Sequence, residues 1–150
     1  MKPCAPLFAV GLALLAPAAA RADECRRVAD AVIRRTLARE IGETPTFHNV
    51  RLAHDGASEF TVLCAERPQI FVASERIPDP LYLMLIGASA AAAFGGREAA
   101  LAGIAADCLV AAATGDGHAE RDSGGLHFDC GANSAARDYS VGVFRLGRGP

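Results

Sequence analysis

Hydrophobic residues recur every three or four positions early in the chain and predict an amphipathic helix over residues 24–40. The apolar stripe of this helix comprises Cys25, Val28, Ala29, Val32, Ile33 and Leu37. The other side carries the arginines Arg26, Arg27, Arg34, Arg35 and Arg39. Gly42 and Pro45 are expected to end the helix.

The hydrophobic period then changes from that of a helix to that of a strand. Residues 46–53 and 58–65 predict two strands joined at His54-Asp55-Gly56-Ala57, where Asp-Gly is a strong turn signal. Alternation places Phe60, Val62 and Cys64 on one face. Residues 69–74 predict a third short strand.

Residues 81–94 are apolar on all sides, and Gly95-Gly96 separates them from a second helical pattern over 97–113. The first segment is about six residues short of the roughly 20 that a membrane span needs, which favours a buried helix. The second helix has an apolar stripe made of Leu101, Ile104, Ala105, Cys108, Leu109 and Ala112. The two helices are expected to form a hairpin.

The last part of the chain predicts a polar loop over 114–125, a strand over 126–130 and a final strand over 138–146. Phe128 and Cys130 fall on one face of the first of these strands, and His127 and Asp129 on the other. The expected fold class is α+β: an antiparallel sheet covered by three helices and stapled by two disulfides. The strands come in two clusters, so two halves of helix plus strands are an alternative.

The first residues have the pattern of an export signal. Lys2 gives a positive start, residues 7–15 form a short apolar run, and Ala20-Arg21-Ala22 matches a signal-peptidase site. We therefore expect a signal peptide at 1–22, a single domain at 23–150, and a periplasmic or extracellular location.

The expected location implies that the cysteines are oxidised to disulfides. Cys4 leaves with the leader, and the remaining four, Cys25, Cys64, Cys108 and Cys130, allow three pairings. Each half of the chain has one cysteine on a helix stripe and one on a strand, which predicts Cys25–Cys64 and Cys108–Cys130. Swapped pairing between the halves and a cysteine metal site are the alternatives, although the chain lacks the close cysteine spacing of zinc knuckles.

Charge excludes one class of partner. Removing Lys2 and Arg21 with the leader leaves 13 basic and 17 acidic residues, a net charge of 13 − 17 = −4. Nucleic-acid binding needs clustered positive charge, so we expect no nucleic-acid partner.

The densest set of metal-ligating residues lies at 116–129, where His118, His127 and Asp129 are the metal candidates. The spacing matches neither a calcium loop, because the twelfth position is His127, nor the HExxH pattern. A solvated acidic loop is the favoured interpretation. The other ligands considered are Asp116, Glu120 and Asp122.

Other candidate residues give weaker signals. Ser89 lies in a near-match to the GxSxG elbow but within a continuous apolar helix, which favours a structural role. Cys130 has His127 on the opposite strand face, and a disulfide would remove its thiol. His48 and His54 are expected to share a strand face beside Val50 and Leu52. The five-arginine face of the first helix favours simple solvation over lipid or partner binding.

The stretch Phe47-His48-Asn49-Val50-Arg51, followed by Val62-Leu63-Cys64-Ala65-Glu66 and Phe71-Val72, resembles small exported bacterial proteins of unassigned function. The likeness covers residues 45–73. Ala65 stands where that family has glycine, Leu63 is an extra residue, and a glycine-tyrosine step before Phe71 is missing. The resemblance implies a secreted three-stranded unit behind an amphipathic helix.

Taken together, the sequence favours a non-enzymatic periplasmic or secreted binding protein of the inhibitor or immunity type, with a protein partner and no cofactor. Segment 114–125 and the hairpin tip at residues 54–56 are the expected contacts, because loops carry binding more often than strands. The alternatives are a small metal-dependent hydrolase using residues 116–129 and a membrane-attached subunit held by residues 81–113.

Overall fold

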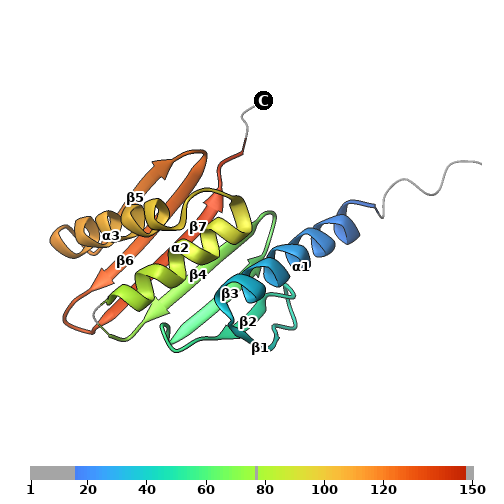
Figure 1. The fold of residues 1–150 in the computed structure, drawn as a ribbon, viewed down its shortest axis with the longest axis horizontal. Coiled ribbons are helices and arrows are strands. Elements are labelled where there is room, and N and C mark those ends of the chain that lie inside the picture. Colours follow the sequence, from blue (N-terminus) through green and yellow to red (C-terminus); the bar gives the residue numbers. More distant parts are fainter. Residues whose placement is uncertain (1–15, 77, 148–150) are drawn as a thin grey trace, which may run out of the picture.

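The computed structural model describes residues 16–76 and 78–147, which form three helices and one seven-stranded antiparallel sheet (Figure 1). The helices are α1 (Ala16–Thr36), α2 (Pro80–Phe94) and α3 (Glu98–Thr114). The strands are β1 (Arg39–Glu43), β2 (Val50–Ala53), β3 (Glu59–Cys64), β4 (Pro68–Ser74), β5 (His118–Ser123), β6 (Leu126–Asn133) and β7 (Asp138–Arg145). This confirms the predicted α+β fold class.

The sheet runs in the order β1-β2-β3-β4-β7-β6-β5, so the two clusters of strands meet where β4 pairs with β7. The order β2-β3-β4 on one side of this junction corresponds to β5-β6-β7 on the other. The register agrees with this correspondence: Phe60 lies opposite Val72, as Phe128 lies opposite Val143. Each half therefore repeats a helix followed by antiparallel strands within one continuous sheet.

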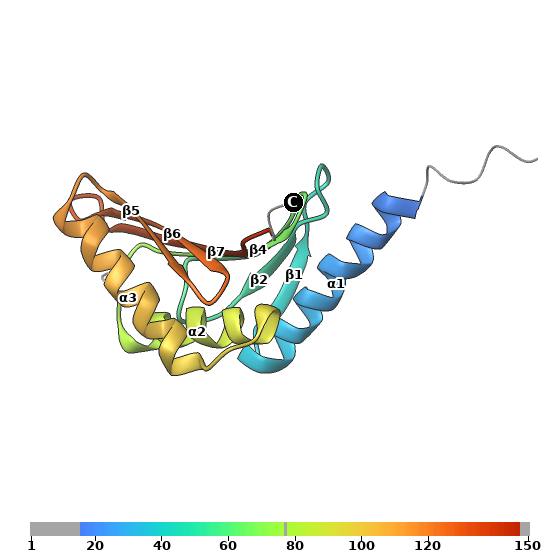
Figure 2. The same cartoon turned by 90° about the horizontal axis from the view of Figure 1, so that it is seen from above.

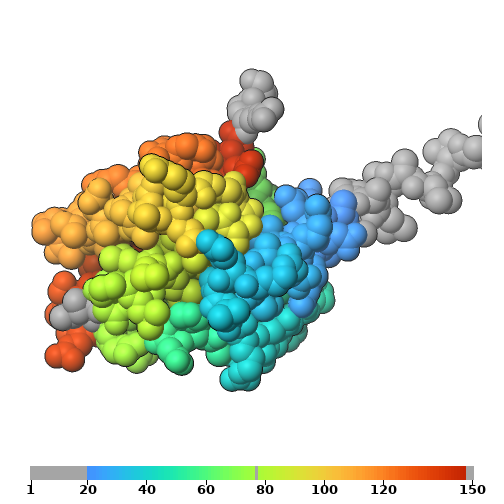
Figure 3. Space-filling view, viewed as in Figure 1, coloured from blue at the N-terminus to red at the C-terminus, as the bar shows by residue number. Residues whose placement is uncertain are grey.

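All three helices cover the same face of the sheet (Figures 2 and 3). Strand residues that point toward the helices are almost completely buried and alternate with residues of the opposite face. They comprise Val50, Leu52, Phe60, Val62, Ile70, Val72, Phe128, Cys130, Val141 and Val143. The core therefore lies between the helices and one face of the sheet.

Both predicted cysteine pairings are confirmed. Cys25 of α1 is bonded to Cys64 of β3, and Cys108 of α3 to Cys130 of β6, with Cα–Cα separations of 5.5 and 5.9 Å. Each disulfide ties a helix to a strand of its own half. The sheet and the helix layer are therefore cross-linked at two separate places.

The first helix ends earlier than its hydrophobic pattern predicts. Thr36 is its last residue, because Leu37 takes a left-handed conformation with φ of 58° and turns the chain away. The Thr36 hydroxyl donates to the Val32 carbonyl and accepts from the Ala38 amide, which holds this turn. Leu37, predicted on the apolar stripe of this helix, is 88% exposed, and Arg39 and Glu40, predicted as its last residues, belong to β1.

Three further boundaries differ from the prediction. Residues 46–49 precede β2 instead of belonging to it, because Thr44 and Asn49 close a backbone turn there. The predicted polar loop 114–125 contains the whole of β5, and β6 extends to Asn133, beyond the predicted strand 126–130. In these segments backbone pairing with β6 and β7 forms strands without an apolar pattern of their own.

Helices α2 and α3 form the predicted hairpin. Pro80 opens α2, and the Asp79 side chain accepts a hydrogen bond from the Tyr82 amide at 2.9 Å, which caps the helix. Five members of the predicted α3 stripe are buried, and Ile104 is half-buried. Within residues 16–76 and 78–147, no helix combines the length and the hydropathy that crossing a membrane needs.

Tyr82 makes the stability of the fold sensitive to alkaline pH. Its ring is 1% exposed and its hydroxyl donates to the Val72 carbonyl at 3.0 Å. Burial, and next the negative charge of Asp138, raise the pKa of Tyr82 above its usual range. A raised pKa in the folded state means that unfolding releases a proton once the pH exceeds the unfolded value of about 10.

We therefore expect the free energy of unfolding to fall by about 1.4 kcal/mol per pH unit above about pH 10 from this group alone. Tyr82→Phe should remove this slope and lower stability at neutral pH by about 1 kcal/mol, because the Val72 carbonyl loses its donor. Urea denaturation between neutral pH and pH 11.5 measures both effects. In the control Tyr139→Phe the fall of the free energy of unfolding with pH should persist. An unchanged fall in Tyr82→Phe would contradict its assignment to Tyr82.

Candidate functional site

The face of the sheet opposite the helices carries no covering element among the described residues (Figure 2). At its centre, side chains of the three middle strands make a half-buried apolar area. These are Leu63 of β3, Phe71 of β4 and Phe144 of β7. Thr61, beside Phe71 in the register, is only 4% exposed. We call this side of the sheet the open face.

The register places these residues in adjacent rows. Leu63, Gln69, Phe144 and His127 follow one another across β3, β4, β7 and β6. The ring of His127 packs against the ring of Phe144, with centroids 4.9 Å apart. The side chain of Gln69 extends from this row over Gly142 in the next row. A Cβ atom on Gly142 would collide with it. The centre of the open face thus consists of two phenylalanines, a leucine and an imidazole, with Gln69 between Leu63 and Phe144.

One rim of the open face is acidic. Alternation along β5 and β6 places His118, Glu120 and Asp122 beside His127 and Asp129. Nε2 of His118 lies 2.8 Å from Oδ1 of Asp129, and Nδ1 of His127 lies 2.6 Å from Oδ1 of Asp122. Glu120 lies directly opposite Asp129 and is exposed. The hairpin therefore presents a fixed array of carboxylates and imidazoles.

The opposite rim is basic. Arg51 pairs in register with Thr61 and so lies on the open face, and Arg39 lies opposite Ala53 on the same face. Both arginines are exposed. The open face thus carries arginines on β1 and β2, an exposed glutamate, Glu59, on β3, an apolar centre, and carboxylates on β5 and β6.

The metal candidates do not converge on one point. His127 and Asp129 share a strand face, as predicted, but each pairs with a different residue of β5: His127 with Asp122, and Asp129 with His118. Across residues 16–76 and 78–147, no group of three or more His, Cys, Asp or Glu side chains has an arrangement that could hold a metal ion. Asp116 lies outside the array, in the turn before β5, where its carboxylate accepts from the His118 amide.

The remaining sequence candidates have structural roles. Ser89 is fully buried and its hydroxyl donates to the Leu85 carbonyl at 2.6 Å, as a helix residue and not a nucleophile elbow. The predicted shared face of His48 and His54 is wrong. His48 lies in the loop before β2 near Glu43, and His54 accepts from the Gly56 amide in the hairpin turn. That hairpin tip packs against Leu81 of α2 instead of projecting freely.

The predicted arginine face is divided between ion pairs. Arg26 holds Glu40 of β1 with two hydrogen bonds and also pairs with Asp30 and Glu43. The bond from Arg26 holds the pKa of Glu40 below its usual range. Arg35 pairs with Glu98 of α3. Arg39, predicted on the helix, lies on β1, so the face is not a continuous cationic surface.

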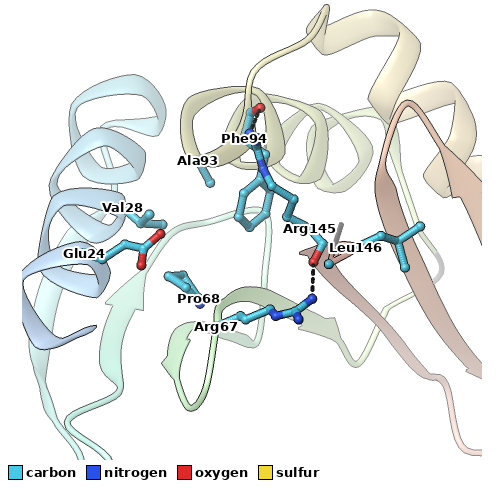
Figure 4. Close-up of a pocket in the computed structure, with 9 residues that line it drawn as sticks. Glu24, Val28, Arg67, Pro68, Ala93, Phe94, Arg145 and Leu146 are labelled. Carbon is cyan, nitrogen blue, oxygen red and sulfur yellow. Dashed lines mark hydrogen bonds between the residues drawn. The ribbon is translucent and has the colours of Figure 1, made fainter. Parts of the chain in front are cut away.

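A cavity of about 390 Å³ opens between the middle of α1, the end of α2, the start of β4 and the end of β7 (Figure 4). Glu24 and Val28 form one wall, and two arginines line it. Arg145 donates to the Phe94 carbonyl at 2.7 Å, and Arg67 donates to the Arg145 carbonyl at 3.4 Å. Because both guanidinium groups bind main-chain oxygens, they join elements of the fold, and the cavity is a weaker candidate than the open face.

Comparison of the chain with protein-family models, with curated proteins and with solved structures gives no match. The function of the chain is therefore inferred from its own geometry. The resemblance seen at residues 45–73 stays a prediction; the segment contains β2, β3 and all of β4 except Ser74.

Proposed function

We propose that this is an exported, non-enzymatic protein that binds another protein through the open face of its sheet, as an inhibitor or immunity protein does. The observation that carries the proposal is the arrangement of that face. A half-buried apolar centre of Leu63, Phe71 and Phe144 is surrounded by charged residues on both rims. An apolar centre within a polar rim is typical of protein–protein interfaces.

Rigidity supports the same proposal. Phe71 and Phe144 lie on the two central strands, which pair with each other and with further strands on both sides. Both halves of the sheet are fixed to helices by disulfides. A surface held this way loses little conformational entropy when it binds, so more of the contact energy contributes to affinity.

Export is part of the proposal. Two disulfides are typical of proteins that leave the reducing cytosol, which supports a periplasmic or extracellular location. Most of the predicted leader, residues 1–15, lies outside the described residues, and α1 already includes Ala20-Arg21-Ala22. Cleavage before Asp23 would remove the first part of this helix and leave Cys25 near its new start.

Site-specific crosslinking tests the proposal. A photoreactive amino acid at Phe71 or Phe144 should capture a partner, whereas the same probe at Val110, which is 63% exposed on α3, should not. With the captured protein purified, Phe71→Ala and Phe144→Ala should each weaken binding about tenfold or more, as expected for buried aromatic anchors. Val110→Ala is the matched control and should leave the dissociation constant unchanged.

Thermal melting of each variant separates loss of contact from loss of fold. The proposal is wrong if the probe at Val110 captures the partner and if Phe71→Ala and Phe144→Ala, both still folded, bind that partner as tightly as the unchanged protein does.

A further inference from the structure

The charge pattern of the open face specifies which kind of protein fits it, an inference that rests on the proposed function. On the β5–β6 rim, Glu120, Asp122 and Asp129 place three carboxylates on the open face. The one arginine of these two strands, Arg121, pairs in register with the buried Phe128 and so lies on the helix side of the sheet. It donates to the Glu120 carbonyl. Arg137 stands apart, in the β6–β7 turn.

The size of the face argues for a folded protein as its occupant. Five strand-to-strand steps separate β2 from β5 in the sheet order. At about 4.8 Å per step, the arginine rim and the acidic rim are about 24 Å apart. An interface of standard size covers about 800 Å² on each partner. The width of such a patch is similar to the distance between the two rims. A single small molecule would not reach from one rim to the other.

The two rims also fix the orientation of the partner. Phe71 and Phe144, on the two central strands, lie between Arg51 on β2 and the carboxylates of β5 and β6. Opposite charges placed across an interface determine its register and disfavour partners with like charges. A complementary surface has lysine or arginine residues over β5 and β6, an apolar contact over Phe71, and acidic residues over Arg39 and Arg51.

We propose that the open face recognises a protein whose contact surface is basic where it meets the β5–β6 hairpin. The apolar centre supplies the contact area, and the carboxylates of Glu120, Asp122 and Asp129 select the partner by its positive charge. The hydrogen bonds from His118 and His127 orient two of these carboxylates.

Two synthetic peptides of equal length test this selection. Both alternate an aromatic residue with a charged one, lysine in the first peptide and glutamate in the second. Each is titrated into isotope-labelled full-chain protein, and backbone amide shifts report where it binds. The lysine peptide should shift amides of β4, β5, β6 and β7 and bind at least tenfold more tightly than the glutamate peptide. Added salt should reduce that difference.

Charge reversal supplies the matched variants. Glu120→Lys should remove the preference for the lysine peptide, whereas Asp107→Lys, an equal charge change at an exposed position of α3, should preserve it. The assignment of a basic partner would be overturned if the protein bound the two peptides equally tightly or bound the glutamate peptide more tightly. It would also be overturned if neither peptide shifted any amide at millimolar concentration. Those results would leave the proposed function standing if Phe71 still crosslinks a protein. Shifts confined to α2 and α3 would overturn both.

Discussion

Replacing the buried disulfide with alanines, as Cys108→Ala/Cys130→Ala, should lower the free energy of unfolding by about 4 kcal/mol. The bridge joins residues 22 apart, for which restriction of the unfolded chain accounts for about 3 kcal/mol. Both cysteines are fully buried between α3 and β6, so removing the sulfur atoms also leaves a cavity. Because small domains are stable by only about 5–15 kcal/mol, urea denaturation should show a large shift in midpoint.

The other disulfide provides the comparison. Cys64 is half-buried, and both Cys25 and Cys64 line a groove of about 680 Å³ at the surface. A soluble thiol should therefore open Cys25–Cys64 in the native protein first, while Cys108–Cys130 resists until the domain unfolds. Alkylation followed by peptide mapping identifies which cysteines have reacted. Reduction in the reverse order would contradict this account, and a Cys64–Cys108 peptide under non-reducing conditions would contradict both pairings.

The pairing of the cysteines was predictable because both partners of each bridge lie on elements with a clear hydrophobic period. Cys25 and Cys108 belong to helical stripes, and Cys64 and Cys130 share strand faces with Phe60 and Phe128. Burial of apolar side chains fixed which way these elements face. Where that driving force acts, the sequence pattern and the structure agree, as they also do for the α2–α3 hairpin.

The elements that the sequence analysis missed are those held by backbone pairing. Strand β1 has the sequence Arg-Glu-Ile-Gly-Glu with a register shift between Glu40 and Gly42, and β5 has His-Ala-Glu-Arg-Asp-Ser. Both are edge strands, so neither needs an apolar face. One signal did exist: Gly124 and Gly125, both with positive φ, form the two-residue turn between β5 and β6. A glycine pair of this kind is a hairpin signal, which the polar surroundings obscured.

That omission also concealed the candidate site. With residues 114–125 interpreted as a loop, the ligands on that segment had no defined positions relative to His127 and Asp129. As a hairpin, residues 118–129 place His118, Glu120 and Asp122 on one face beside His127 and Asp129. The positions of Phe71 and Phe144 beside this hairpin depend on the pairing of β4 with β7, a contact between the two halves of the chain. No local pattern encodes that pairing, so the open face could not be derived from the sequence.

The close approach of α2 and α3 gives the second large expected effect, a loss of stability in Gly87→Ala. A Cβ atom on Gly87 would lie 2.5 Å from the Glu98 carbonyl oxygen and 3.0 Å from the Cβ of Ala102. Both obstacles belong to the neighbouring helix α3, and one is main chain, so the helices must separate. Overpacking of this kind costs about 1–3 kcal/mol, which exceeds the gain of about 1 kcal/mol that alanine brings to a helix interior.

Gly103 on α3 is the matched control, because a Cβ atom there meets nothing within 4 Å. Gly103→Ala should therefore stabilise the protein by about 0.5–1 kcal/mol, through helix propensity and a less flexible unfolded chain. The same substitution in two packed helices thus has opposite signs, which chemical denaturation of the two variants measures directly. Equal stabilisation in both variants would mean that α2 and α3 do not pack as closely at Gly87 as the structure shows.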